Sequence, residues 1–218
     1  MNIPDNWTFD SSDVAAGFEG HVREQLPWYD LVTDAVAQIG RHYIAEGGLV
    51  YDIGASTGNV AAALRATVKD RNGAIVGIEP SAAMAERHNG IGTLIRGRAE
   101  DFPFEPFDFA VSMLALMFVN PNAVPALIDR LAKTCKPGGA VVVVERTLPP
   151  SGYPSLVTSR LTLAAKAAAG APAEQIVAKE LSLAGVQRPI SADVLIAHGA
   201  VEWFRFGDFA GYLIEGAA

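Results

Sequence analysis

The sequence lacks the features that would cross-link the chain or anchor it in a bilayer. It contains one cysteine, Cys135, so no internal disulfide can form and no cysteine cluster can hold a metal. The valine-rich run 140–144 is too short to span a membrane and is followed by Glu145 and Arg146. The first residues lack the basic segment and apolar core of a secretion signal. These absences predict a cytoplasmic protein with no membrane span.

Basic side chains are also scarce. The 17 Lys and Arg residues against 24 Asp and Glu give a net charge of -7, which opposes binding to a polyanion unless the bases cluster. Arg65, Lys69 and Arg71 lie close in sequence but form no dense run, so we interpret them as solvated surface residues. The charge therefore favours a small-molecule partner over nucleic acid.

A glycine-rich turn follows an apolar strand that begins at Val50. Gly54 and Gly58 permit backbone angles closed to other residues, and their missing side chains let a ligand lie against the main chain. Helix formers follow from Asn59, so the turn lies between a strand and a helix. A second strand, residues 74–78, ends at Glu79. An acid at that point can accept hydrogen bonds from ribose hydroxyls, so the pattern predicts a nucleoside site.

The spacing of this turn differs from the common phosphate-binding patterns. The chain has neither G-x-G-x-x-G after the strand nor G-x-x-x-x-G-K-[ST]. Its pattern, Asp52-x-Gly54-x-x-x-Gly58, instead puts a carboxylate where a diphosphate would approach. A carboxylate repels phosphate and attracts an ammonium or a sulfonium. The turn therefore favours S-adenosylmethionine over NAD or FAD.

Five sequence blocks between Val50 and Glu145 together resemble a class I S-adenosylmethionine-dependent methyltransferase. In order, they are Gly54–Gly58, Gly77–Met84, Gly97–Phe104, Phe107–Ser112 and Lys136–Val144. The resemblance implies an α/β fold, a Rossmann-like methyltransferase sandwich with a mostly parallel seven-stranded sheet, an antiparallel C-terminal strand and helices on both faces. It also implies S-adenosylmethionine as cofactor, S-adenosylhomocysteine as product and no metal.

The same resemblance assigns binding roles by position. The glycine turn would hold the methionine part of the cofactor, Glu79 the ribose, and Met84 with residues 98–100 the adenine. The expected cofactor-binding residues are Tyr29, Asp52, Gly54, Ala55, Ser56, Gly58, Glu79, Pro80, Met84, Arg98, Ala99, Glu100 and Met113.

A second resemblance extends beyond the core. Trp7–Asp10, Pro27–Asp30 and Trp203–Gly207 are similar to segments of the carboxy-S-adenosylmethionine synthases, which prepare a cofactor for wobble-uridine modification in tRNA. Their cofactor-contacting tyrosine corresponds to Tyr29. A homodimer and a tRNA-related pathway are suggested by this resemblance alone.

Three departures separate the chain from those synthases. Glu180 stands where they carry an arginine that pairs with the extra carboxylate of their cofactor, and a carboxylate there would repel that group. Met113 replaces an asparagine and Arg98 an aspartate. We therefore expect a methyltransferase that uses ordinary S-adenosylmethionine on an unidentified small acceptor. Synthase-like chemistry, or cofactor binding without catalysis, remain the alternatives.

The alternation of helical and strand patterns predicts one methyltransferase domain covering residues 1–218. Its expected parts are a helical arm at 1–45 with a helix from 29 to 44, a cofactor-binding core at 50–145, a helical substrate cap at 149–191 with helices at 155–169 and 173–185, and closing strands within 200–214.

No catalytic residue is assigned, because methyl transfer to a good nucleophile requires little beyond alignment. His21 is either a base in the arm or a solvated histidine, and the solvated interpretation is favoured. Trp28 and Tyr29 either bracket the substrate or pack in the core. Four cap cations suit an anionic substrate or, as the favoured interpretation, form a charged helix face; they are Arg160, Lys166, Lys179 and Arg188.

Overall fold

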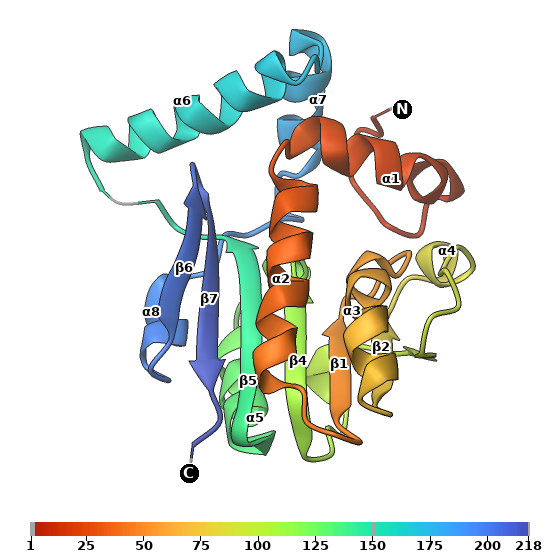
Figure 1. Cartoon of the computed structure of the whole chain (residues 1–218). Helices are drawn as coiled ribbons and strands as arrows, with labels where there is room; N and C mark the ends of the chain where they lie inside the picture. Colours follow the sequence, from red (N-terminus) through yellow and green to blue (C-terminus); the bar gives the residue numbers. More distant parts are fainter. Residues whose placement is uncertain (1–2, 150, 218) are drawn as a thin grey trace.

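Seven strands form one sheet in the computed structural model, which describes residues 3–149 and 151–217 (Figure 1). The strand order is β3-β2-β1-β4-β5-β7-β6. The strands are β1 (Leu49–Ile53), β2 (Ala74–Glu79), β3 (Thr93–Arg96), β4 (Phe107–Met113), β5 (Cys135–Arg146), β6 (Val201–Phe206) and β7 (Phe209–Glu215). Strands β1 to β5 pair in parallel, and β7 runs antiparallel to both β5 and β6. The predicted methyltransferase-like sheet is confirmed.

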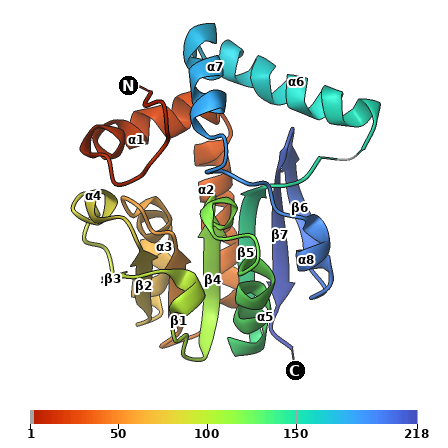
Figure 2. The same ribbon diagram turned by 180° about the vertical axis from the view of Figure 1, so that it is seen from behind.

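Helices cover both faces of the sheet (Figures 1 and 2). One face carries α2 (Tyr29–Tyr43) and α3 (Asn59–Asp70), and the other carries α5 (Val124–Thr134) and α8 (Ala192–Ile196). Beyond the carboxyl ends of the parallel strands lie α1 (Ser12–Gln25), α6 (Tyr153–Ala168) and α7 (Ala173–Ser182). The remaining short elements are α4 (Ala82–Ala85), η1 (Ala99–Asp101) and η2 (Leu116–Phe118).

The valines of β5 show why this sequence makes a two-sided core. Val142 and Val144 join the cluster under α2 and α3, whereas Val141 and Val143 join the cluster under α5. All four side chains are fully buried. A central parallel strand covered on both faces requires such a continuous apolar run, and β-branched residues suit its pleated backbone.

Some element ends differ from the expected ones. Strand β5 begins at Cys135, ahead of the valine-rich run 140–144, because Cys135 pairs with Phe107 before a shift in register. Helix α7 ends at Ser182, short of 185, and Gly185 then adopts a left-handed φ of 74°. The expected cap at 149–191 includes Pro150, which lies outside the described residues. Within the described ranges, no helix is both long enough and apolar enough to cross a bilayer.

Candidate functional site

A cavity of about 190 Å³ lies at the carboxyl ends of the central strands, below α1 and α7. The glycine turn after β1 and the ends of β2 and β4 form its floor. Predicted cofactor residues that line it are Tyr29, Asp52, Gly54, Ala55, Ser56, Glu79, Pro80, Met84 and Met113. The fold therefore brings residues from four separate sequence blocks to one cavity.

Four predicted cofactor residues do not line this cavity. Gly58 precedes α3 with a φ of 93°, and a Cβ there would lie 2.5 Å from Asn89 Oδ1. Arg98 lies before η1 and forms an ion pair with Glu100. Ala99 lies within η1, where its carbonyl accepts a hydrogen bond from an arginine of α5. Their contact with a cofactor stays a prediction.

The glycine turn is fixed against its neighbours by close backbone packing. Gly54 has a φ of 73°, and a Cβ at this position would lie 2.5 Å from the Cβ of Ala115. The backbone N–H groups of Gly54 and Ala55 both donate to the carbonyl of Ile78 on β2, at 2.9 and 3.1 Å. Only glycine fits this position, because any side chain would have to displace the loop after β4.

Glu79 is held at the tip of β2 by the backbone around it. Its Oε2 accepts a hydrogen bond from the Ser56 N–H and its Oε1 one from the Ser81 N–H, both at 2.8 Å. Burial raises the pKa of Glu79, and those two hydrogen bonds oppose the rise. Each carboxylate oxygen keeps a further lone pair, so the group can still accept hydroxyl donors from a ligand.

Asp52 is a second buried acid in the same half of the cavity. Its side chain is 2% exposed, and its Oδ2 has no hydrogen-bond partner among the described residues. Burial raises the pKa of Asp52 to about 7, and the nearby Glu79 adds to the rise. A buried carboxylate in this state is stabilised by a cation, so this half of the cavity suits a positively charged ligand.

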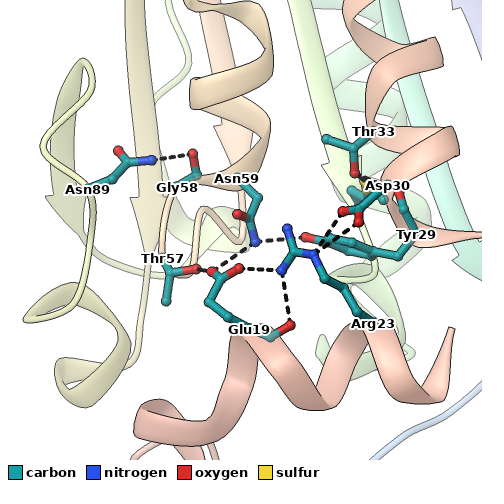
Figure 3. Close-up of polar contacts among 10 residues, drawn as sticks. Glu19, Arg23, Tyr29, Asp30, Thr33, Thr57, Gly58, Asn59 and Asn89 are labelled. Carbon is teal, nitrogen blue, oxygen red and sulfur yellow. Dashed lines mark hydrogen bonds and ion pairs between the residues drawn. The ribbon is translucent and has the colours of Figure 1, made fainter. Parts of the chain in front are cut away.

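Helix α1 is fastened to the glycine turn by Glu19 (Figure 3). The carboxylate of Glu19 accepts hydrogen bonds from the Thr57 hydroxyl and, at 3.0 Å, from Asn59 Nδ2. Asn59 also donates to the hydroxyl of Tyr29 at 3.1 Å. Arg23, one turn further along α1, donates to Glu19 Oε2 at 2.6 Å. This network, here called the Glu19 latch, joins α1, α2 and α3 beside the cavity.

The N-terminal arm lies over the cavity together with α1 and α7, and these three segments are here called the roof. The backbone N–H of Trp7 donates to the carbonyl of Ser182 on α7 at 2.9 Å. The hydroxyl of Ser81, at the start of α4, donates to the carbonyl of Phe9 at 2.8 Å. The Phe9 ring also meets that of Phe118 edge to face, with centroids 4.9 Å apart. The arm therefore spans from α4 to α7 and covers the cavity.

Two of the four cap cations are exposed and two are buried. The expectation of a solvated side chain is wrong for the two buried lysines and for His21. Arg160 on α6 is exposed, as a charged helix face requires, and Arg188 is also exposed but lies between α7 and α8, outside both helices. Lys166 and Lys179 are instead 5% and 9% exposed and line the cavity, because α6 and α7 direct them inward. His21 is 5% exposed and also lines the cavity, so the solvated interpretation is wrong for it.

Glu180 in the cap forms ion pairs with two cations. Its Oε1 lies 2.7 Å from Lys166 Nζ, and its Oε2 lies 3.2 Å from a guanidinium nitrogen of Arg146. These two cations lower the pKa of Glu180 although burial opposes ionisation. Sequence spacing gave no signal for these pairs, since Arg146 lies at the end of β5, far from α7 in the chain.

The two aromatic residues at the start of α2 have different surroundings. Trp28 packs on Phe204 and Phe209, each with a centroid distance of 5.1 Å, and does not line the cavity. Tyr29 does line it. His198 lies in the turn after α8. No group of three or more His, Cys, Asp or Glu side chains in the described parts of the chain is placed to bind a metal.

Comparisons with known proteins agree with this architecture. Residues 50–139 match the family model described as a methyltransferase domain. The chain is 28% identical to carboxy-S-adenosyl-L-methionine synthase of Staphylococcus epidermidis, over 96% of this chain and 97% of that protein. It is 30% identical to the Shewanella woodyi synthase, over 90% of this chain and 83% of that protein. Human N-acetylserotonin methyltransferase, solved with S-adenosylmethionine, shares the fold with a TM-score of 0.58 and 15% identity; the match covers 95% of this chain and 57% of that one.

Proposed function

The chain belongs to the methyltransferase-domain family that includes the carboxy-S-adenosyl-L-methionine synthases, and we propose that it transfers a methyl group from S-adenosylmethionine to a small-molecule acceptor. The observation that supports this most directly is the cavity, which joins an acidic half floored by the glycine turn to a half lined by the cap. One half suits a cationic nucleoside, and the other leaves room for a second small molecule.

The residues of the acidic half fit S-adenosylmethionine. Gly54 and Ser56 place backbone against the ligand, and Glu79 retains lone pairs for ribose hydroxyls. The unpartnered Oδ2 of Asp52 suits a positively charged group. Met84 is buried beside the turn, where Ser56 Oγ lies 3.5 Å from its sulfur. We propose these residues as the cofactor site.

When bound, S-adenosylmethionine supplies a methyl group on a sulfonium that a nucleophile can attack. The protein's part is to align the acceptor with that methyl and to keep water away. Phe9 and Phe118 shield the cavity from above, and Tyr29 and Met113 line it beside the turn. Burial raises the pKa of the Tyr29 phenol to about 12, so this hydroxyl stays protonated at neutral pH.

A second candidate function is synthesis of the carboxylated cofactor. The two bacterial relatives named above are carboxy-S-adenosyl-L-methionine synthases, and the match to this chain covers most of their length. Glu180 is the residue that separates the two proposals. It occupies the position proposed for the carboxylate-binding arginine, and a second carboxylate beside it would be repelled. Its existing pairs with Arg146 and Lys166 already engage both of its oxygens.

The experiment that tests the assignment is identification of the ligand that co-purifies, by native mass spectrometry followed by denaturation. We expect S-adenosylmethionine or S-adenosylhomocysteine; recovery of the carboxylated form would overturn the proposal. Titration should then give at least about tenfold tighter binding of S-adenosylmethionine than of the carboxylated cofactor, or about 1.4 kcal/mol. Glu180→Arg should narrow this ratio more than Glu180→Gln, which removes the charge without adding a cation.

A further inference from the structure

Glu145 places a buried carboxylate at the end of an apolar strand face. It follows Val141 and Val143 on β5, and because side chains alternate along a strand, all three point to the face under α5. Glu145 is 0% exposed and does not line the cavity. A buried carboxylate is costly unless it is hydrogen-bonded, so its partners explain how the fold tolerates it.

The partners of Glu145 are three consecutive backbone N–H groups in the loop after β4, residues 114–118. Its Oε1 accepts hydrogen bonds from the N–H groups of Ala115 and Leu116 at 2.9 and 2.7 Å. Its Oε2 accepts one from the N–H of Met117 at 3.2 Å. The hydroxyl of Ser112, near the end of β4, also donates to Oε1 at 3.3 Å. One side chain therefore fixes the backbone of three successive loop residues.

The first residue of this loop has a strained backbone. Leu114 has a left-handed φ of 62°, which is unfavourable for a residue other than glycine. Its N–H donates to the carbonyl of Val144 at 2.7 Å, and the bonds to Glu145 begin at the next loop residue. Strain of this kind persists only where the surroundings impose it. The end of β5 imposes it here, through one backbone carbonyl and one side chain.

The same loop forms part of the cavity beside the glycine turn. Its lining residues are Leu114, Ala115, Met117 and Phe118. The Cβ of Ala115 would lie 2.5 Å from a Cβ added at Gly54. A displacement of the loop would therefore change the space beside the glycine turn, although Glu145 itself stays out of the cavity.

The negative charge of Glu145 suits this arrangement. Burial raises its pKa to about 7, and the hydrogen bonds from Leu116, Ala115 and Met117 oppose the rise because they favour the ionised form. A carboxylate accepts at both oxygens, whereas an amide accepts at its oxygen and donates at its nitrogen. Glu145→Gln should therefore keep part of the network and place an amide N–H against a backbone N–H.

We propose that Glu145 is a positioning residue for the cofactor: by accepting the N–H groups of residues 115–117 it sets where the loop stands against the glycine turn. The loop in turn shapes the space beside Gly54, where the methionine part of the cofactor is proposed to lie. The adenosine part is proposed to lie against Glu79 and Met84, which belong to β2 and α4. Loss of Glu145 should therefore weaken binding of the methionine part more than binding of adenosine. The inference rests on the proposed function for the identity of the ligand.

The test compares the affinities for S-adenosylhomocysteine and for adenosine, by calorimetry at pH 8, where Glu145 is ionised. The ratio of the two affinities is the readout, because partial unfolding of a variant weakens both in the same proportion. We expect Glu145→Ala to lower the ratio by at least about tenfold, and Glu145→Gln to lower it by a smaller factor.

Asp108→Ala is the matched control. Asp108 is also a buried acid, but it lies near the amino end of β4, where its Oδ2 accepts the N–H of Leu49 at 2.9 Å. Its loss should destabilise the fold and leave the ratio unchanged. An unchanged ratio in a folded Glu145→Ala or Glu145→Gln variant, or an equal fall in Asp108→Ala, would overturn the proposal.

Hydrogen exchange of backbone amides, followed by NMR in the ligand-free protein, tests the loop without the cofactor. Glu145→Ala should accelerate exchange at residues 115–117 by at least about tenfold relative to Leu49, and Asp108→Ala should act on Leu49 instead. Equal acceleration at all four amides would contradict a role of Glu145 in the loop. If the unmodified protein binds neither S-adenosylhomocysteine nor adenosine, the proposed function fails, and the exchange rates still decide whether Glu145 holds the loop.

Discussion

Gly54 shows how much of the site depends on one missing methyl group. Its φ of 73° is unfavourable for other residues, and an added Cβ would lie 2.5 Å from the Cβ of Ala115. We predict that Gly54→Ala weakens S-adenosylhomocysteine binding by at least about tenfold, because the loop after β4 must move. Calorimetric titration measures the loss.

Gly47 offers a matched control for that substitution. It also has a left-handed φ, 66°, but a Cβ at this exposed position meets nothing within 4 Å. Gly47→Ala should also destabilise the fold, because alanine disfavours a left-handed φ, but it should leave the affinity for S-adenosylhomocysteine unchanged. If the two variants lose affinity equally, close packing at Gly54 is not what shapes the site.

The sequence predicts the position of a residue best where local spacing fixes its backbone, whereas its contact with a cofactor stays a prediction. Gly54 and Glu79 could be identified because a turn and a strand end fix where their backbone lies. His21 and Lys179 could not be interpreted in that way. Both lie on helices with polar neighbours, and only the packing of α1 and α7 over the sheet determines that these two side chains point inward.

At the scale of elements, α1 acts as part of the roof through the Glu19 latch. Burial opposes ionisation of Glu19, but hydrogen bonds from Thr57, Arg23 and Asn59 outweigh it and lower its pKa. We predict that Glu19→Ala accelerates dissociation of S-adenosylhomocysteine by about tenfold, since charge-assisted bonds of this kind contribute roughly 1.5–3 kcal/mol. Stopped-flow displacement measures the rate.

Glu24 provides the control for the latch. It lies on the same helix but is exposed, so Glu24→Ala should leave the dissociation rate as it is. An unchanged rate in Glu19→Ala would mean that α1 does not limit ligand exit. The existence and order of these helices were predictable from apolar periodicity, whereas their contacts across the cavity depend on tertiary packing that no local pattern encodes.

At the scale of the whole molecule, buried acids make stability depend on pH. The pKa of Asp52 is raised from an ordinary 3.8 to about 7, so the folded ligand-free protein binds this proton more tightly than the unfolded chain does. The stabilisation from that proton is complete below pH 4 and is lost as pH rises toward 7. Glu145, also buried with a pKa raised to about 7, acts in the same direction.

We therefore predict that the unmodified protein loses about 2–3 kcal/mol relative to Asp52→Asn between pH 5 and pH 7, because each pKa unit corresponds to about 1.4 kcal/mol. Denaturant unfolding without ligand at several pH values measures the difference. Glu145 is present in both proteins, so its contribution cancels. Parallel pH profiles of the two proteins would show that Asp52 is not protonated in the fold.

The bond between Trp7 and Ser182 also sets an order of events during synthesis. A ribosome releases the N-terminal arm long before α7, so the arm emerges without the surface that it covers in the finished protein. Until then its aromatic side chains lack that covering surface, and exposed apolar surface of this kind is what chaperones bind. The cavity is covered only after the cap has been translated.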